Sequence, residues 1–126
     1  MSNAPTERQI FEALAFIWDV TAALELIQGR QPNRHINVDD WADLLRFVSI
    51  DENHAATVDL TEPVLLAPLP DPSTGQPGME MPIDGWHRIS RALAEGVATL
   101  SAIALTPEEE RKVRIRGGSR SSRHGR

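Results

Sequence analysis

The chain has 126 residues, 40% of them hydrophobic and 5% aromatic, and it carries a formal net charge of −5. This length and composition fit one globular domain, and no apolar run approaches the roughly 18 residues that a membrane-spanning helix needs. There is no cysteine, which excludes disulfides, thiol catalysis and zinc–thiolate sites. We therefore expect a cytoplasmic protein that has no membrane contact.

The charge is divided unevenly along the chain. Residues 111–126 hold seven of the 13 basic residues and none of the 18 acidic ones. The acidic body argues against a broad DNA-binding face, because phosphate contacts need clustered Lys and Arg. The tail is rich in Gly, Ser and Arg, a composition typical of disorder. It is either a solubilising segment without a partner or a weak contact for nucleic acid.

Two helices are expected in the first 55 residues. Thr6 and Gln9 form a capping pair at the start of the first helix. Its apolar residues recur at helical spacing: Ile10, Leu14, Ile17 and Leu24. Asn37 or Asp39 can cap the second helix. Four apolar residues share one face of it: Trp41, Leu44, Leu45 and Val48. The apolar positions of residues 10–27 are either a core face or the surface of a homodimer.

The pattern changes after residue 55. Strands are expected at 56–60, 64–69, 79–83 and 99–105. The unbroken apolar run at 64–69 suits a strand that is buried on both faces. A helix over 86–95 ends at Gly96, and Thr106 starts another helix with a proline and acidic residues in its first turn. The strand–helix–strand unit over 79–105 predicts a right-handed crossover, and the whole pattern predicts an α+β fold.

The junction of strand and helix at Ile83 to Arg88, sequence IDGWHR, contains the most functional information. The first N–H groups of a helix lack partners within it, and the helix dipole favours an anion there. Gly85 allows close approach, His87 and Arg88 can reach the same anion, and Asp84 can hold Mg²⁺.

The same residues have a plainer interpretation. Asp-Gly is a common turn pair, Asp84 can simply cap the helix, and Arg in a first turn is often solvated. Trp86 can stack on a nucleobase, although a Trp at a helix start packs into the core more often. From the residues alone, an anion site and an ordinary strand, turn and helix both stay open.

The span from residue 56 to about 110 resembles the ParB/sulfiredoxin-like superfamily, especially its small stand-alone members. PVLLAPL, MPIDGWHRISRALAEG and LSAIALTPEEE are similar to that family's strand, strand with a Gly-x-His/Arg-Arg corner, helix and closing strand. The resemblance implies a small mixed sheet, here preceded by the two N-terminal helices. We expect residues 1–55 to pack on a core at 56–113, followed by a disordered basic tail at 114–126.

The resemblance also implies roles for individual residues, because related corners bind nucleotide phosphates. The phosphate-binding residues would be Gly85, His87 and Arg88. The ligand would be a nucleoside triphosphate with Mg²⁺ at Asp84. Three carboxylates are candidates for a catalytic group in phosphotransfer: Asp59, Glu62 and Asp84. Trp86 occupies the position of the catalytic cysteine of sulfiredoxins, so reduction of sulfinic acid is excluded.

A second resemblance concerns the first half of the chain. RHINVDDWADLLRFVSIDENHAA is similar to a family of small plasmid-borne proteins with an RH…DW…D…N pattern. It implies an origin in a mobile element and groups six residues: Arg34, His35, Asp40, Trp41, Asp51 and Asn53.

Two functions follow as hypotheses. The first is a nucleotide- or phosphate-binding domain that carries out phosphotransfer or nucleotide-switched regulation. The second is a non-enzymatic interaction or regulatory module of a plasmid or mobile element. It would bind protein or nucleic acid through the N-terminal helices and the basic tail.

Overall fold

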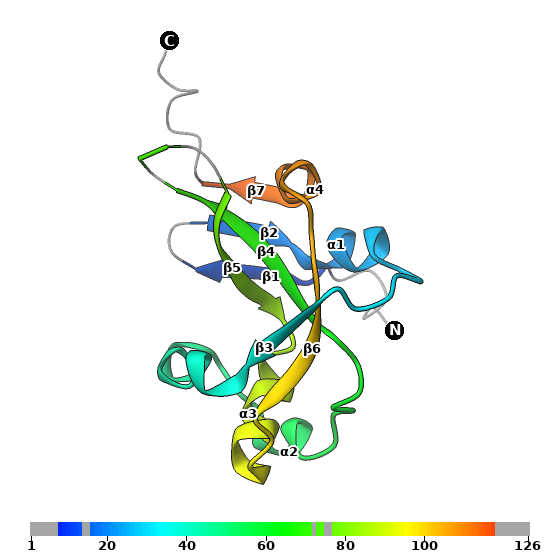
Figure 1. Cartoon of the computed structure of the whole chain (residues 1–126), viewed down its shortest axis with the longest axis vertical. Helices are drawn as coiled ribbons and strands as arrows, with labels where there is room; N and C mark the ends of the chain where they lie inside the picture. Colours follow the sequence, from blue (N-terminus) through cyan, green and yellow to red (C-terminus); the bar gives the residue numbers. More distant parts are fainter. Residues whose placement is uncertain (1–7, 14–15, 72, 75–76, 118–126) are drawn as a thin grey trace.

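The computed structural model describes residues 8–13, 16–71, 73–74 and 77–117 of the chain. The strands in these residues are β1 (Ile10–Ala13), β2 (Phe16–Asp19), β3 (Arg34–Asn37), β4 (Val64–Pro70), β5 (Pro77–Asp84), β6 (Thr99–Ala104) and β7 (Arg114–Arg116). The helices are α1 (Val20–Leu26), α2 (Glu52–Ala55), α3 (Trp86–Glu95) and α4 (Pro107–Val113), with 3-10 helices η2 (Val38–Trp41) and η3 (Asp43–Phe47). The predicted α+β class is confirmed (Figure 1).

β4 lies inside a four-stranded sheet of order β3-β6-β4-β5. It pairs antiparallel with β5 and parallel with β6. Its residues 64–69 are all buried, which confirms the strand predicted from the unbroken apolar run. Pro68 is tolerated here because the pairing with β6 ends at Leu66, and the register with β5 shifts between Pro68 and Pro70.

The prediction of two N-terminal helices is wrong, because the described chain begins with strands. β1 and β2 form an antiparallel hairpin, and β7 from the C-terminal end completes a sheet of order β1-β2-β7. The helix starts only at Val20, where Asp19 Oδ1 accepts the Ala22 N–H (3.0 Å). Aromatic and β-branched residues before Asp19 suit a strand, and β7 supplies a partner that helical spacing cannot reveal. Thr6 and Leu14 lie outside the described residues.

Two further predictions of secondary structure are corrected. The second expected helix is replaced by the two 3-10 helices η2 and η3. Asn37 directly precedes η2, but its side chain makes no capping hydrogen bond. Residues 56–60, expected to form a strand, are turns and irregular chain between α2 and β4. Their alternating pattern did not become a strand because Asp59 Oδ1 accepts hydrogen bonds from the N–H and the hydroxyl of Thr61, a local arrangement that favours a turn.

The elements from β5 to α4 have the types and the order that the sequence predicts. α3 ends at Gly96, whose φ is 76°, and α4 has the capping box of Thr106 and Glu109. The expected crossover between parallel strands is wrong, because β4 lies between β5 and β6 and β5 runs opposite to both. The parallel connection instead runs from β4 to β6.

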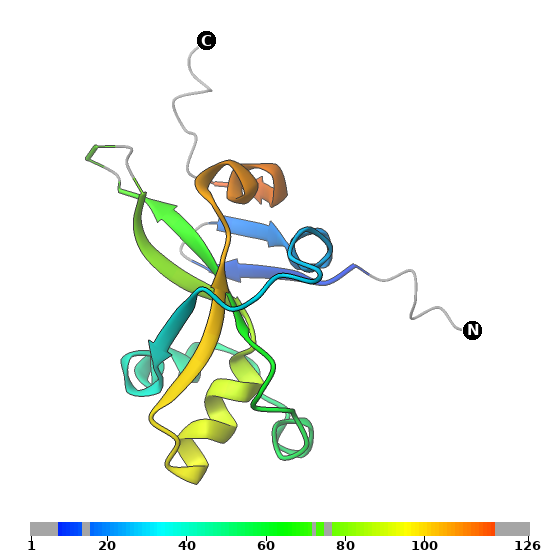
Figure 2. The same ribbon diagram turned by 45° about the vertical axis from the view of Figure 1, so that its right-hand side comes forward.

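The three-stranded sheet and α3 lie toward opposite ends of the molecule (Figures 1 and 2). Figures 1 and 2 show β1, β2 and β7 near one end with α4 and α1, and α3 with α2 near the other. β3 pairs with β6, so residues on both sides of position 55 share one sheet. Residues 114–116, expected to belong to the tail, form β7. None of the helices in the described ranges is long and apolar enough to cross a bilayer.

Candidate functional site

Gly85 joins β5 to α3 and determines the shape of the corner. Its φ of 102° lies in the left-handed region, which glycine adopts without strain. A Cβ atom at position 85 would lie 3.1 Å from Val64 Cγ2 and 3.3 Å from Val64 Cα. The close packing of this corner against the start of β4 is therefore a second reason for glycine at this position. The first bond within α3 runs from the Ile89 N–H to the Gly85 carbonyl (3.0 Å). No side chain in the described part of the chain caps α3, which leaves first-turn amides open to an acceptor.

The guanidinium of Arg88 is turned back into the fold. Its Nη2 donates to the Pro63 carbonyl (3.1 Å) and to Asp84 Oδ2 (3.2 Å), while Nη1 lies 3.9 Å from Glu62 Oε1. The side chain is 13% exposed, and its buried Nε has no hydrogen-bond partner among the described residues. Gln9 Nε2 donates to Asp84 Oδ1 (3.1 Å). Arg88 thus ties α3 to the ends of β4 and β5.

His87 is held as a hydrogen-bond acceptor. Its Nε2 accepts the backbone N–H of Asp51 (3.1 Å), so a proton on Nε2 would abolish this bond. The ring of His54 lies edge-on to His87, with 4.6 Å between the ring centroids. Burial lowers the pKa of His87, and the charge of His54 lowers it further against the opposing effects of Asp51 and Asp84. A lowered pKa favours the neutral imidazole, the form that accepts the Asp51 N–H.

The structure places the candidate carboxylates at the same end of α3. Glu62 and Asp84 both lie beside Arg88. Asp59 lies in the turn before β4 and accepts the N–H (2.9 Å) and the hydroxyl (2.6 Å) of Thr61. These hydrogen bonds lower the pKa of Asp59, and the charge of Arg88 adds to the effect. All six residues named for the nucleotide site therefore lie in one neighbourhood, although their assigned roles stay predictions.

The polar side chains of this corner already form hydrogen bonds with other groups of the protein. Both oxygens of Asp84 accept hydrogen bonds, one from Gln9 and one from Arg88. Within the described ranges, no three His, Asp or Glu side chains are grouped so that they could hold a metal ion. An incoming phosphate would have to compete with Asp84 and the Pro63 carbonyl for Arg88, beside acidic neighbours that repel it.

Three of the six residues of the second resemblance make side-chain contacts in different parts of the fold. Arg34 in β3 forms a bidentate pair with Glu80 of β5 (2.9 and 3.0 Å). Asp51 caps α2 by accepting the N–H groups of Asn53 and His54. Trp41 packs edge-on against Trp86 instead. The contacts of Arg34 and Asp51 account for both residues without a shared site.

A cavity of about 550 Å³ was missed by the sequence analysis. Its lining is mainly apolar and includes Ile10, Phe11, Leu44, Phe47, Val48 and Trp86. Phe47 is 78% exposed and Ile10 is 55% exposed. The sequence offered one indication of it: Phe47 is a large apolar residue that lies outside the apolar face expected for the second helix. β1 forms the opposite wall, and its strand conformation could not be recognised from a pattern with helical spacing.

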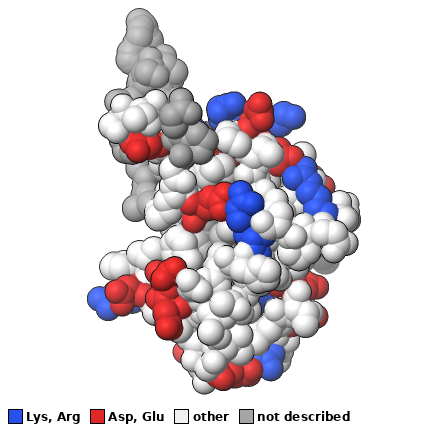
Figure 3. Space-filling model, viewed as in Figure 1, with Lys and Arg blue, Asp and Glu red and all other residues white. Residues whose placement is uncertain are grey.

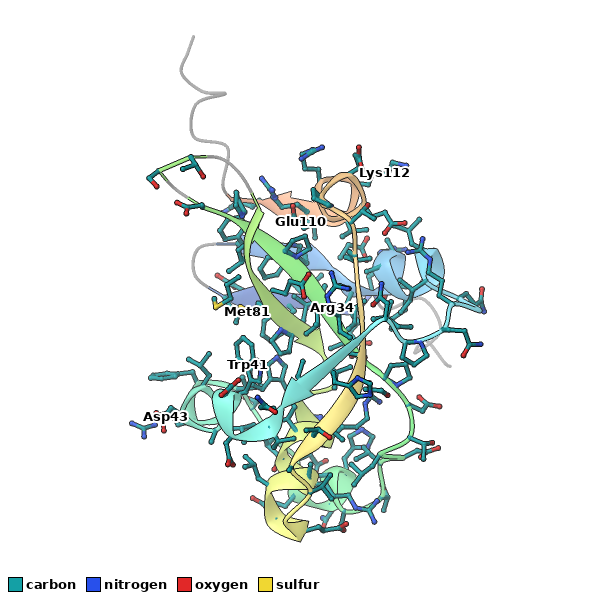
Figure 4. The ribbon with its side chains drawn as sticks, viewed as in Figure 1. Arg34, Trp41, Asp43, Met81, Glu110 and Lys112 are labelled. Atoms are coloured by element: carbon teal, nitrogen blue, oxygen red, sulfur yellow. The ribbon has the colours of Figure 1, made fainter. Side chains whose placement is uncertain are left out.

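Aromatic side chains form the inner wall of this cavity. Phe11 stacks on Trp18 and on Trp86, with ring centroids 6.3 and 6.1 Å apart. Trp86 is buried and donates its Nε1–H to the Pro82 carbonyl (3.0 Å), so it packs in the core as the plainer interpretation expected. Met81 of β5 also lines the cavity, and Figure 4 shows it on the same side of the molecule as Trp41.

The cavity and the corner are neighbours in the fold. Trp86 lines the cavity and is also the first residue of α3. Ser49 lines it as well, two residues before Asp51, whose N–H binds His87.

Comparison of the chain with protein-family models, with curated proteins and with solved structures gave no match. The geometry of these two neighbouring features therefore carries the functional argument.

Proposed function

We propose that this chain is a binding module that holds an apolar group in the cavity between β1, η3 and the start of α3. The observation that carries the proposal is the cavity itself, about 550 Å³ with a mainly apolar lining. Sites for small ligands typically have about 300–1,000 Å³ and a few polar groups among apolar ones. Glu12 and Ser49 are the polar members of the lining that the structure describes. This proposal belongs to the second of the two hypotheses drawn from the sequence, a non-enzymatic interaction module.

The rim of the cavity supports binding more than internal packing. Ile10 and Phe47 expose large apolar surfaces on its two sides. Exposed apolar groups that converge on one hollow mark a binding surface, whereas scattered ones do not. Covering them would release water from both walls at once, which is the main favourable contribution to such binding.

A titration with the neutral dye Nile red tests the proposal. We expect saturable fluorescence enhancement with the wild type, and binding about tenfold weaker in Ile10→Ser, because part of an isoleucine side chain no longer contacts the dye. Ile115→Ser is the matched control, because Ile115 is 56% exposed in β7, away from the cavity, and Ile10 is 55% exposed. Absence of dye binding, or equal loss in both variants, would contradict the proposal.

A second candidate function is binding of a nucleotide phosphate, with Mg²⁺, at the first turn of α3. Its support is the resemblance of the GWHR corner, the missing side-chain cap of α3 and the buried Nε of Arg88, which lacks a partner in the described residues. Phosphotransfer would additionally use Asp59 or Glu62 as the carboxylate that orients a nucleophile.

Calorimetric titration of ATP, ADP, CTP and GTP with magnesium tests this second candidate. We expect binding that is lost in Arg88→Ala and retained in Arg91→Ala. Arg91 is the control because it lies less than one turn further along α3 and binds the Val58 carbonyl and Glu95 instead. Circular dichroism must show that both variants are folded. Absence of heat with every nucleotide would exclude this candidate.

A further inference from the structure

The cavity runs along the free edge of β1. All four residues of this strand, Ile10–Ala13, line it. Successive side chains of a strand point to opposite faces, so a hollow that touches four consecutive residues lies along the strand's edge. In the order β1-β2-β7, β1 is the outer strand and pairs only with β2 among the described strands.

The hydrogen-bond pattern shows which backbone groups of β1 face this edge. The Val20 N–H donates to the Gln9 carbonyl (2.8 Å), and the same register pairs Ile10 with Asp19. Residues of an antiparallel pair alternate between hydrogen-bonded and non-bonded positions. Gln9 faces β2, so Ile10 and Glu12 present their N–H and C=O groups away from β2, toward the open edge.

From this arrangement we infer that the ligand is an extended peptide segment that adds to β1 as a further strand. The inference rests on the proposed function and names its partner. Backbone groups of the peptide pair with those of Ile10 and Glu12, and alternate apolar side chains enter the cavity. An exposed strand edge supplies the hydrogen bonds, while the pocket beside it selects the side chains.

The charge around the cavity indicates a basic peptide. Glu12 lies on one wall, and Asp43 is exposed in η3, which contributes to the other wall. Asp39 and Asp40 are exposed in η2, which directly precedes η3 in the chain. The exposed cation in the same segment is Arg46. In Figure 3, acidic side chains and a basic one lie at the lower left, where Figure 1 shows the turns between β3 and α2. A segment with Lys or Arg flanking its apolar residues matches this field.

A second copy of the chain fits the site less well. Pairing of two β1 edges would bring a second Phe11 to the site, but that ring is stacked on its own Trp18 and Trp86. Ile10 alone would then enter a cavity of about 550 Å³. A partner of different sequence fills the space that such a dimer leaves empty.

The test is a selection from a displayed library of hexapeptides with a fixed central Leu, performed on the wild type and on three variants. Glu12→Gln removes the charge. Glu12→Pro removes the outward N–H without touching the bonds to β2, since proline is tolerated at such an edge position. Glu12→Lys reverses the charge. We expect basic sequences on the wild type and a weaker preference for them on Glu12→Lys, because the aspartates of η2 and η3 remain.

Affinities of the selected peptide, synthesised with an acetylated N-terminus, give the quantitative result. We expect binding about two- to fivefold weaker for Glu12→Gln, which loses one exposed ion pair. Binding should be about tenfold weaker for Glu12→Pro, which loses the same ion pair and also one backbone hydrogen bond. N-methylation of the peptide amides that face β1 should weaken binding at least as much. The circular dichroism spectrum of Glu12→Pro must match that of the wild type, which shows that the fold is retained.

Three results would overturn the inference alone. The first is that the wild type binds Nile red but selects no peptides more strongly than Glu12→Pro does. The proposed function would then still hold. The second is equal affinity for the N-methylated peptide, which would mean that the strand edge is not used. The third is a dimer in solution that dissociates in Glu12→Pro, which would identify a second copy as the occupant. Absence of dye binding would remove the proposed function and the inference together.

Discussion

Replacing Glu110 by Gln tests whether a buried ion pair joins α4 to the N-terminal sheet. Glu110 is 2% exposed, and its Oε2 accepts the Nε1–H of Trp18 (2.9 Å) and the Nε–H of Arg114 (2.8 Å). Its Oε1 accepts from Arg114 Nη2 (2.6 Å). Figure 4 labels Glu110 at this junction. The neutral amide of Gln would leave the guanidinium without a counter-charge and would turn one acceptor into a donor.

The magnitude follows from burial. Removing one partner of a buried pair costs about 3–5 kcal/mol of unfolding free energy. We expect about 3 kcal/mol, the lower end of that range, because Arg114 keeps the Gly117 carbonyl (3.0 Å) and the Phe16 ring (5.3 Å to its centroid). Glu95→Gln is the matched control, since Arg91 and Glu95 are also four residues apart with a 2.7 Å contact, but partly exposed. It should cost only about 0.3–0.5 kcal/mol.

Urea unfolding followed by circular dichroism at pH 7 measures both values. The slope against urea concentration must agree between the variants and the wild type, so that the shifts report stability alone. The double replacement Glu110→Leu with Arg114→Met should be less destabilising than Glu110→Gln, because no charge is left buried. A difference below about 1 kcal/mol between Glu110→Gln and Glu95→Gln would refute the argument from burial.

Three further changes test individual contacts. Gly85→Ala should destabilise the protein by roughly 2–4 kcal/mol in urea unfolding, from the positive φ and the contact with Val64; a loss below about 1 kcal/mol would contradict the close packing. The pKa of His87 is lowered in the folded state from 6.5. Its contribution to stability is therefore complete above pH 6.5 and falls at lower pH, and His87→Gln should flatten this dependence between pH 7.5 and 5. The hydrogen bonds from Arg30 lower the pKa of Glu109 from 4.5 to about 2. This contribution is present above pH 4.5 and is lost toward pH 2, so acid unfolding of Arg30→Gln should begin at higher pH than in the wild type.

The elements that the sequence predicted well are those with local causes. β4 is apolar at every position from 64 to 69, so it suits burial on both faces whatever its neighbours are. α3 and α4 carry their own start or stop signals, the left-handed glycine Gly96 and the capping box of Thr106. Such signals operate within a few residues and survive in any tertiary context that tolerates the element.

The corner at Asp84 to Arg88 was predictable as a place but not as a set of contacts. The strand, the glycine and the helix start are adjacent in sequence, so their order predicts a corner with free amides. The acceptors for Arg88 are Pro63 and Asp84, and the donor to His87 is Asp51. Two of these three partners lie more than 20 residues away, where no periodicity can assign them.

The N-terminal half shows what only the tertiary structure decided. Ile10, Ile17 and Leu24 have helical spacing, yet Ile10 and Ile17 lie in β1 and β2 because β7 pairs with β2 from more than 90 residues further along. Intrinsic preferences differ by only a few tenths of a kcal/mol per residue, so the burial of Trp18 and a long-range strand partner outweigh them. The cavity has the same origin, since β1, η3 and Trp86 form it only after the chain has folded. By itself the sequence determined the class, the central strand and the helices that carry their own caps; the N-terminal sheet, the open edge of β1 and the cavity beside it depend on contacts between distant segments.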